Sequence, residues 1–264
     1  MKALINGIDV EYRDEGRGIA VILIHAFPMS QAMWDEQVAV LGRICRVITV
    51  DLRGFGDSDV PPGPYWMPLM ASDVRGLMSR LGIDAAVLMG LSMGGYVAMS
   101  FYRNFPDAVR GLILADTRAA ADNPEGRERR LKSAEKAERE GTESIVDEMV
   151  QVLLSQAAIE TRPDVVSRVR RIALQNQPGA LAAAQLGMAA RTDSAEMLAA
   201  ADCPSLVIVG SEDRLSTPGE TRGWQERMPN SRLAVIEGAG HLSNIEQPDQ
   251  FNRAVAEFIT TLAI

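Results

Sequence analysis

The sequence predicts an α/β fold in which a mostly parallel, eight-stranded sheet is covered by helices on both faces. Three observations support this prediction. Short apolar runs alternate along the chain with segments whose apolar residues recur at helical spacing. Several of these runs are apolar throughout, as strands that are covered on both faces must be. The alternation stops after residue 116 and resumes near residue 202, which indicates an all-helical insertion in the fold.

Length and composition favour one large core that carries an insertion. A chain of 264 residues can bury a single large core. We expect residues 1–116 and 202–264 to form the core domain and residues 117–201 to form a helical cap, with approximate boundaries. With 47% hydrophobic and 23% charged residues, the composition is that of an ordinary soluble globular protein.

The charge balance restricts the classes of partner. A formal net charge of -8 and a pI near 5.0 argue against binding to nucleic acid or to an anionic membrane. No run reaches the ~18 apolar residues that a membrane span needs. Residues 1–7 show no feature of a signal peptide, so we expect a cytoplasmic protein whose partner is a small molecule. The oligomeric state stays open, with a homodimer as one option.

Cysteine and histidine are scarce in this chain. Cys45 and Cys203 each lie in or beside an apolar strand-like segment, so two buried thiols are favoured over a disulfide. A zinc site needs about four such ligands, and the only histidines are His25 and His241. We therefore expect neither a metal nor a cofactor.

The first 116 residues predict a hairpin followed by alternating strands and helices. Residues 2–14 read as two short strands around Asn6-Gly7, a dipeptide typical of tight hairpin turns. Further strands are expected at residues 19–24, 45–50, 87–91 and 109–115. Helices are expected at residues 31–41, 69–81 and 93–105. Gly82 and Pro106 follow the second and third of these helices, and both residue types favour a helix end.

The segment after residue 116 has a different composition. Residues 117–201 contain mainly Ala, Glu, Arg, Leu and Met at helical spacing and no buried strand pattern. Residues 125–140 are densely charged, which indicates a solvated helix, with partner binding as the less favoured alternative. The alternation then resumes, with strands expected at residues 205–210 and 233–236 and helices at 219–227 and 247–262.

A Gly-x-Ser-x-Gly pattern lies where the strand at residues 87–91 passes into the next helix. Gly90 and Gly94 supply the small residues that a crowded turn around Ser92 requires. Such a turn would place the serine hydroxyl at a helix N-terminus, where backbone donors favour negative charge. The plain alternative is an ordinary turn serine, but the position between a strand and a helix favours a nucleophile.

A serine hydroxyl needs an adjacent base that is oriented by a third group. His241 lies in a small-residue loop after the last predicted strand, and Asp213 directly follows the preceding strand. Both loops belong at the carboxyl ends of the strands, where open α/β sheets place their sites. Glu212 and Asp116 are rival acids: Glu212 would point the other way from the strand end, and Asp116 closes another strand. His241 could instead be a capping or core histidine.

An anionic intermediate on Ser92 would need two backbone donors. The amide of Met93 follows the nucleophile and is the first candidate, and the amide of Phe27, in the loop after residues 19–24, is the second.

These motifs together resemble the α/β-hydrolase superfamily over almost the whole chain. His25-Ala26-Phe27-Pro28 is similar to the family's His-Gly-x-Pro oxyanion loop, although Ala26 replaces the usual glycine. Residues 51–58 resemble the family's turn after the fourth strand, and residues 90–95, 210–213 and 240–241 resemble its elbow, acid and histidine loops. The order Ser92, Asp213, His241 is the one expected in this fold. Within the superfamily, the chain looks most like small bacterial carboxylesterases and enol-lactone hydrolases with a helical cap.

A serine nucleophile implies acyl transfer through a covalent acyl-enzyme. We expect cleavage of a small carboxylic ester; an enol-lactone, or a C–C bond in a diketone, is the alternative substrate. A hypothesis of another class is a non-catalytic binding protein on the same scaffold.

Three residues near the oxyanion loop are candidates for the substrate pocket. These are His25, Met29 and Trp34, for which a purely structural role is the alternative. No basic cluster for a phosphate or for coenzyme A is expected.

Overall fold

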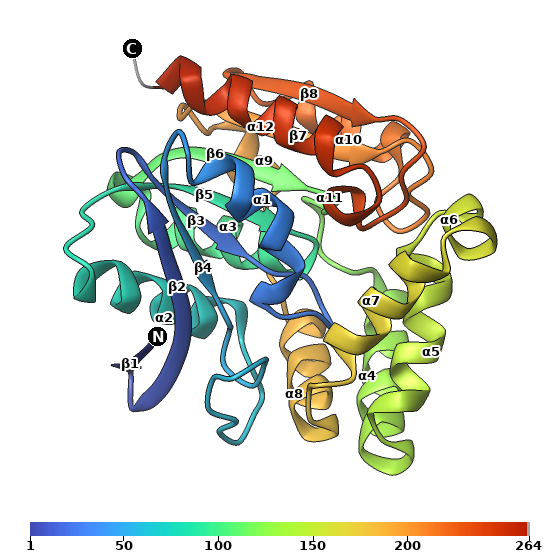
Figure 1. Cartoon of the computed structure of the whole chain (residues 1–264). Helices are drawn as coiled ribbons and strands as arrows, with labels where there is room; N and C mark the ends of the chain where they lie inside the picture. Colours follow the sequence, from blue (N-terminus) through green and yellow to red (C-terminus); the bar gives the residue numbers. More distant parts are fainter. Residues whose placement is uncertain (263–264) are drawn as a thin grey trace.

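The computed structural model describes residues 1–262 and contains one eight-stranded sheet (Figure 1). Its strand order is β1-β2-β4-β3-β5-β6-β7-β8. The strands are β1 (Lys2–Ile5), β2 (Ile8–Gly16), β3 (Ala20–Ile24), β4 (Arg46–Val50), β5 (Ala86–Leu91), β6 (Val109–Ala115), β7 (Ser205–Gly210) and β8 (Ser231–Ile236). β2 pairs antiparallel with β1 and β4, and every other pairing is parallel. The predicted fold class is therefore confirmed.

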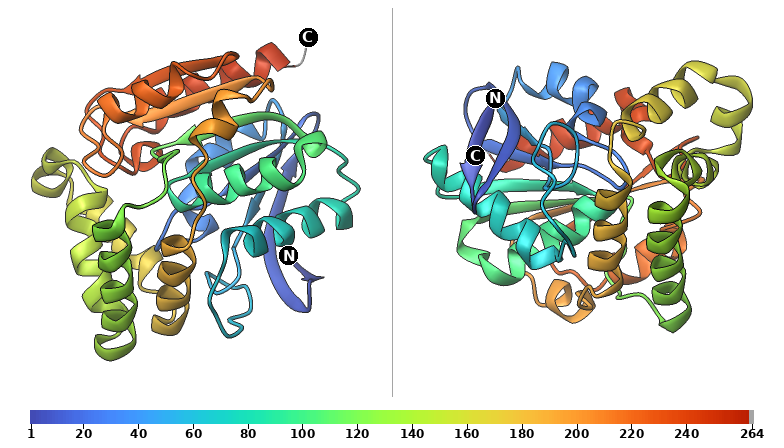
Figure 2. Two further views of the ribbon diagram at one scale, coloured as in Figure 1. Left: turned by 180° about the vertical axis from the view of Figure 1, so that it is seen from behind. Right: turned by 90° about the horizontal axis from the view of Figure 1, so that it is seen from below.

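Helices cover both faces of this sheet (Figures 1 and 2). One face carries α1 (Asp35–Leu41) and α12 (Pro248–Leu262), and the other carries α2 (Met67–Arg80), α3 (Met93–Asn104) and α10 (Pro218–Gln225). In β3, Ile22 and Ile24 join one apolar core while Val21 and Leu23 join the other, as the alternation of side chains along a strand requires. This two-sided burial explains why the central strands are apolar throughout.

Every predicted strand and helix is present, but several bounds differ by one or two residues: β2 ends at Gly16 and not at residue 14, β8 begins at Ser231 and not at residue 233, and α10 ends at Gln225 and not at residue 227. α2 begins at Met67 and not at residue 69, because Pro68 occupies the first helical turn, where the missing amide hydrogen costs nothing. The helix predicted at residues 31–41 consists of the 3-10 turn η1 (Gln31–Trp34) and then α1. Pro106 starts a second such turn, η2 (Pro106–Ala108), and the last predicted helix is preceded by the short helix α11 (Ser243–Glu246).

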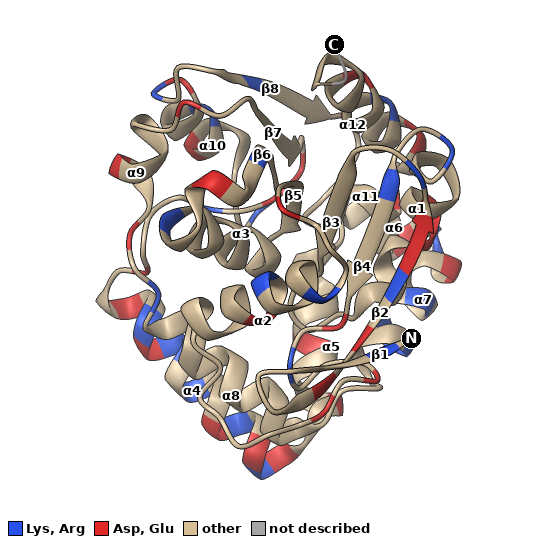
Figure 3. Ribbon diagram, turned by 90° about the vertical axis from the view of Figure 1, so that its left-hand side faces the viewer, with Lys and Arg blue, Asp and Glu red and all other residues tan. Residues whose placement is uncertain are grey.

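Six helices separate β6 from β7. They are α4 (Pro124–Glu140), α5 (Thr142–Leu153), α6 (Gln156–Thr161), α7 (Pro163–Ala173), α8 (Pro178–Ala189) and α9 (Ala195–Ala199). In Figure 1 the helices α4 to α8 lie together to one side of the sheet. Figure 3 shows that α4 carries many charged residues of both signs, as its sequence predicts for an exposed helix. The division into a core domain and a cap at residues 117 and 201 stays a prediction.

Two further expectations concern the thiols and the membrane. Cys45 and Cys203 are both free; Cys45 is buried, whereas Cys203 is only partly buried. Burial raises the pKa of the Cys45 thiol to about 11. Within residues 1–262, no helix is both long and apolar enough to span a bilayer.

Candidate active site

Ser92 lies on a strained turn between β5 and α3. Its φ of 55° and ψ of -113° are unfavourable for a residue with a side chain. The turn closes because its flanking glycines have no Cβ: one added to Gly90 would lie 2.1 Å from the Gly94 carbonyl oxygen. One added to Gly94 would lie 2.1 Å from the Ile24 oxygen. The local sequence therefore forces the serine side chain out of the sheet at the N-terminus of α3.

Ser92, His241 and Asp213 form one hydrogen-bonded chain. The Ser92 Oγ lies 2.8 Å from the His241 Nε2, and the His241 Nδ1 lies 2.8 Å from the Asp213 Oδ2. His241 and Asp213 are each only 3% exposed, whereas Ser92 is partly exposed. The three residues come from loops after β5, β7 and β8, which all end at the same edge of the sheet. This is the geometry that an activated serine requires.

Asp213 is held in place by its own loop. Its Oδ1 accepts the backbone amides of Leu215 and Ser216, at 2.7 and 3.0 Å, and its Oδ2 accepts the Ser216 hydroxyl at 2.5 Å. The rival acids lie elsewhere. Glu212 is exposed, and the Asp116 carboxyl group hydrogen-bonds to the Gly210 amide and the Ser243 hydroxyl. The structure thus brings Asp213, and neither rival, into hydrogen-bond contact with the imidazole.

The acid and the imidazole shift each other's protonation. Burial alone would raise the pKa of Asp213, but the charge of His241 and the hydrogen bonds from His241 and Ser216 hold that pKa below its ordinary value. Burial likewise opposes protonation of His241, but the charge and hydrogen bond of Asp213 outweigh it and raise the pKa of His241. The Asp213 carboxylate therefore favours the protonated form of the His241 imidazole.

Two backbone amides near Ser92 are free to bind an oxyanion. Among the described residues, no acceptor takes a hydrogen bond from the amide of Phe27 or of Met93. Phe27 lines the same cavity as Ser92 and His241, and Met93 is the first residue of α3. The alanine at position 26 fits the oxyanion loop because its φ is not in the left-handed region. The oxyanion role of these amides stays a prediction.

A cavity of about 390 Å³ opens above the serine, within the usual range for small-molecule sites. Its walls come from the oxyanion loop, α3, the loop after β6, the helices α4, α5 and α8, and the loops after β7 and β8. They are formed by Phe27, Ser92, Tyr96, Arg118, Asp122, Arg129, Arg130, Ser133, Glu148, Met149, Val152, Gln185, Met188, Leu215 and His241. Residues 117–201 therefore supply most of the surface that a substrate would meet.

The pocket roles expected of His25, Met29 and Trp34 are wrong. All three side chains are 0% exposed. Met29 and Trp34 belong to the core under the sheet, where the Trp34 ring centroid lies 6.2 Å from that of Phe251. The His25 Nδ1 donates to the Ala26 oxygen at 2.9 Å while its Nε2 accepts the Leu52 amide at 3.1 Å, so the ring links two loops. Burial lowers the pKa of His25, in keeping with this neutral role.

Comparison with known families agrees with this geometry. A family model described as the alpha/beta hydrolase fold matches residues 19–248. The chain belongs to the α/β-hydrolase family. The resemblance to this family that the sequence motifs indicate is therefore confirmed.

Individual α/β-hydrolases are similar to the chain over nearly its full length. 3-Oxoadipate enol-lactonase 2 of Acinetobacter baylyi is 30% identical over 236 residues, which cover 89% of this chain and 86% of that protein. The structure of a thermophilic esterase from Thermogutta terrifontis, with malate bound, has a TM-score of 0.97 at 41% identity and covers 100% of this chain and 99% of its own. The enol-lactonase from Burkholderia xenovorans LB400 has a TM-score of 0.92 at 30% identity, with 98% and 100% covered.

Most of the cavity wall of this α/β-hydrolase was not identified from the sequence. Two residues had a usable signal: Tyr96 lies one helical turn after Ser92, and Leu215 lies two residues after Asp213. The lining residues of α4, α5 and α8 had no such signal, because helical spacing does not determine which face of a helix packs against a distant loop. The charged part of the lining had no signal either: it combines three arginines, Arg118, Arg129 and Arg130, with two acids, Asp122 and Glu148.

Proposed function

We propose that the chain is a serine hydrolase that cleaves a small carboxylic ester through an acyl-enzyme on Ser92. The observation that carries this proposal is the unbroken hydrogen-bonded chain from Ser92 through His241 to Asp213, at the floor of a 390 Å³ cavity. The names of the relatives support the bond class, because they include an esterase and enol-lactonases. A small-molecule ester or lactone is thus the partner that we propose.

The mechanism follows from the positions of the atoms. Ser92 Oγ attacks the ester carbonyl while His241 Nε2 accepts its proton, and Asp213 holds the imidazole in the tautomer that leaves Nε2 free. The amides of Phe27 and Met93 stabilise the oxyanion, a contribution of about 3 kcal/mol per donor in sites of this kind. His241 then donates the proton to the leaving alcohol. Water repeats the sequence on the acyl-enzyme and releases the acid.

The helical segment fits the role of a cap in this proposal. Residues 117–201 supply Met149, Val152 and Met188 to the cavity above Ser92, and these side chains give the acyl or alcohol group an apolar wall. We propose that this segment selects the substrate while the core supplies the chemistry.

Hydrolysis of p-nitrophenyl acetate by matched serine variants tests the proposal. We expect Ser92→Ala to lower kcat by about 10⁴-fold or more, because the nucleophile is lost while binding and fold remain. Ser79→Ala, an exposed serine on α2, is the control and should match the wild type. Turnover should persist in EDTA, since no step uses a metal. If the wild type and both variants all fail to cleave the ester yet bind it, the chain is a binding protein instead.

An enol-lactone is the second candidate substrate. The 30% sequence identity to enol-lactonases over nearly the whole chain favours this substrate. The same triad could open a lactone, because a lactone is a cyclic ester. A side-by-side comparison of kcat/KM for p-nitrophenyl acetate, an enol-lactone and a ring-cleavage diketone decides between them: the natural bond class is the one with the highest value.

A further inference from the structure

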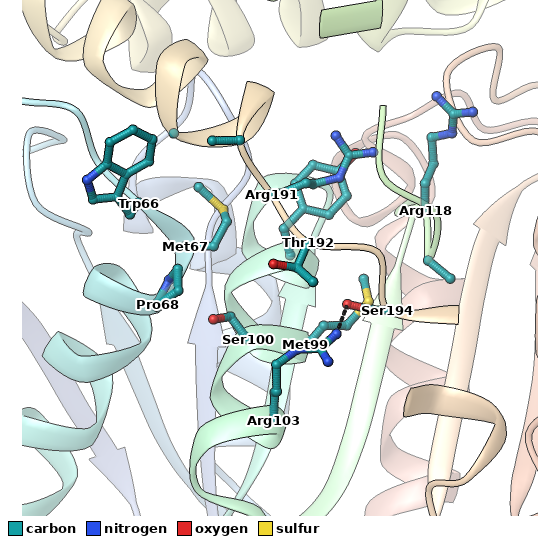
Figure 4. A pocket seen from close by; sticks show the side chains of 14 residues that line it. Trp66, Met67, Pro68, Met99, Ser100, Arg103, Arg118, Arg191, Thr192 and Ser194 are labelled. Atoms are coloured by element: carbon teal, nitrogen blue, oxygen red, sulfur yellow. Dashed lines mark hydrogen bonds between the residues drawn. The ribbon is translucent and has the colours of Figure 1, made fainter. Parts of the chain in front are cut away.

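Figure 4 shows the lining of a second cavity, of about 220 Å³, which shares residues with the cavity above Ser92. It is bounded by the start of α2, the outer part of α3, the loop after β6 and the loop after α8. Tyr96 and Arg118 line both cavities, whereas Ser92 and His241 do not line the second one. It is therefore a neighbouring compartment and not an extension of the proposed catalytic floor.

The lining of the second cavity is positively charged. Its fourteen lining residues include three arginines, Arg103, Arg118 and Arg191, and neither Asp nor Glu. This is unusual for a chain whose formal net charge is -8. Figure 4 shows that the three arginines come from different elements: α3, the loop after β6 and the loop after α8. The fold thus lines one cavity with three arginines from separate elements, with Arg103 on the opposite side from Arg118 and Arg191 in this view.

Arg191 is buried with incomplete pairing. Its residue surface is only 8% exposed, and its guanidinium carbon lies 4.2 Å from the centroid of the Tyr96 ring. Its Nη2 donates to the Ala120 oxygen at 2.7 Å and its Nη1 lies 2.5 Å from the Asp122 Oδ2. Its Nε has no acceptor within residues 1–262. A buried charged group left without a hydrogen bond costs free energy, and the charge of this guanidinium favours an anion in the adjoining cavity.

The neighbouring carboxylates do not balance the arginines. Asp122 also forms an ion pair with Arg130, so one carboxylate faces two guanidinium groups. Arg103 donates through Nη2 to two neutral acceptors, the Asp193 backbone oxygen and the Ser194 hydroxyl, and forms no ion pair with any described acid. Arg118 forms an ion pair with Glu220 at 2.7 Å, and Glu220 does not line the cavity. Among the three lining arginines, Arg103 is therefore the one that forms no ion pair with a described carboxylate.

The rest of the lining suits an organic ligand. Trp66, Met67 and Met99 offer apolar surface, while Ser100 and Thr192 add hydroxyl donors beside the arginines. The volume is below the roughly 300–1,000 Å³ of ordinary ligand pockets, so the ligand must be small. Planar guanidinium groups bind carboxylates through paired hydrogen bonds.

We propose that the second cavity, lined by Arg103, Arg118, Arg191 and Trp66, binds a small organic carboxylate. The carboxylate lies among the arginines, and its hydrocarbon part lies against Trp66 and the methionines. This inference rests on the proposed function in one respect: ester hydrolysis in the adjoining cavity produces a carboxylate. The bound group is either an acid carried by the substrate itself or a separate acid, and both have the same chemistry.

Fluorescence of Trp66 reports binding directly. Trp66 is 43% exposed and lines the cavity, whereas the other two tryptophans, Trp34 and Trp224, are 0% and 9% exposed. We expect succinate to change the emission saturably in the wild type and Trp66→Phe to abolish the change. Arg103→Gln should weaken succinate binding by about tenfold or more, the loss expected for one charge-assisted hydrogen-bond donor. Arg191→Lys should weaken binding less than Arg191→Gln.

The control is Arg110→Gln, which removes an exposed arginine on β6 outside both cavities. It should bind succinate as the wild type does, and circular dichroism should show all variants folded. Calorimetric titration provides the same comparison without fluorescence. The absence of saturable succinate binding, or equal affinity of wild type and Arg103→Gln, overturns the proposal. Because Arg103 is exposed, this result does not depend on whether the Arg191 variants fold.

Two esters distinguish the source of the carboxylate. If the substrate carries it, Arg103→Gln raises KM more for the p-nitrophenyl monoester of succinate than for p-nitrophenyl acetate, and succinate competes with the monoester. If the acid is separate, succinate alters the kinetics of both esters to the same degree. A protein that binds succinate but cleaves neither ester contradicts the proposed function and leaves the carboxylate site standing. A protein that cleaves the esters but does not bind succinate supports the proposed function and contradicts the carboxylate site.

Discussion

At the scale of single residues, protonation is the feature most open to experiment. His241 can act as a base only when its imidazole is neutral. Asp213 raises the pKa of that imidazole, although burial opposes protonation. Directly behind this pair, Asp116 is 0% exposed and hydrogen-bonds to Gly210 and Ser243. His241, Asp213 and Asp116 thus lie in one buried region, where the charge of each affects the pKa of the others.

The first residue-scale prediction concerns the pH dependence of activity. We expect kcat/KM to fall as the pH is lowered through the pKa of His241, with a midpoint above 6.5, the ordinary histidine value. Asp213→Asn removes the charge that raises this pKa, so the acid limb should move to lower pH while kcat drops by about 10⁴-fold. Rates for p-nitrophenyl acetate between pH 5 and 9 measure both effects. An acid limb centred well below 6.5 in the wild type would contradict the coupling.

The second residue-scale prediction concerns stability. Burial and the charge of Asp213 raise the pKa of Asp116 to about 8, against an ordinary value of 3.8. Between these two values the folded chain keeps a proton that the unfolded chain releases, so the stability falls as the pH rises, by up to about 1.4 kcal/mol per pH unit. Asp116→Asn imitates the protonated carboxyl and lacks this slope. The free energy of unfolding of Asp116→Asn minus that of the wild type should therefore increase from pH 5 to pH 8, as measured by urea titration. A constant difference across this range would show that Asp116 is ionised in the native protein.

At the scale of elements, one side chain of α11 ties the helical segment to the histidine loop. Glu246 accepts the Gly240 amide at 2.8 Å through Oε1, and the Ser155 amide and hydroxyl at 3.1 and 2.6 Å through Oε2. Ser155 caps α6, and Gly240 directly precedes His241. A Cβ at Gly240 would lie 2.5 Å from the Ser155 nitrogen, so the two segments pack in close contact.

We expect Glu246→Gln to destabilise the protein by about 1–3 kcal/mol. The NH₂ group of the glutamine would replace a carboxylate oxygen and could not accept the hydrogen bonds that this oxygen accepts. The variant should also lower kcat, since the loop that carries His241 loses its anchor. Glu212→Gln, at an exposed neighbouring carboxylate, serves as the control. Urea unfolding and ester hydrolysis measured on both variants separate the two effects. Equal stability of the two variants would show that Glu246 does not anchor the loop.

Turns that depend on residue types within a few positions can be predicted from the sequence, whereas the exact ends of helices cannot. The hairpin at Asn6-Gly7 and the turn at Ser92 depend on residue types within a few positions, so pattern alone locates them. The sequence pattern begins α2 two residues late, because a proline is compatible both with a loop and with a first helical turn.

At the scale of the whole molecule, the site depends on contacts between distant segments. The order of Ser92, Asp213 and His241 along the chain was sufficient to nominate them, because each follows a strand of a parallel sheet. The cavity lining was not predictable in this way. Met29 and Trp34 lie next to the oxyanion loop in sequence but face the core, whereas Arg191 lies about 100 residues from Tyr96 and stacks on its ring. Only the fold decides which side chains converge.

Covalent labelling by diethyl p-nitrophenyl phosphate identifies the nucleophile directly. We expect one phosphoryl group per chain, located by peptide mass spectrometry on Ser92, with loss of ester hydrolysis in proportion to labelling. Ser92→Ala should take up no label and Ser79→Ala should react as the wild type does. Complete inactivation of the wild type with the label on another residue, or ester hydrolysis that Ser92→Ala retains in full, would show that Ser92 is not the nucleophile.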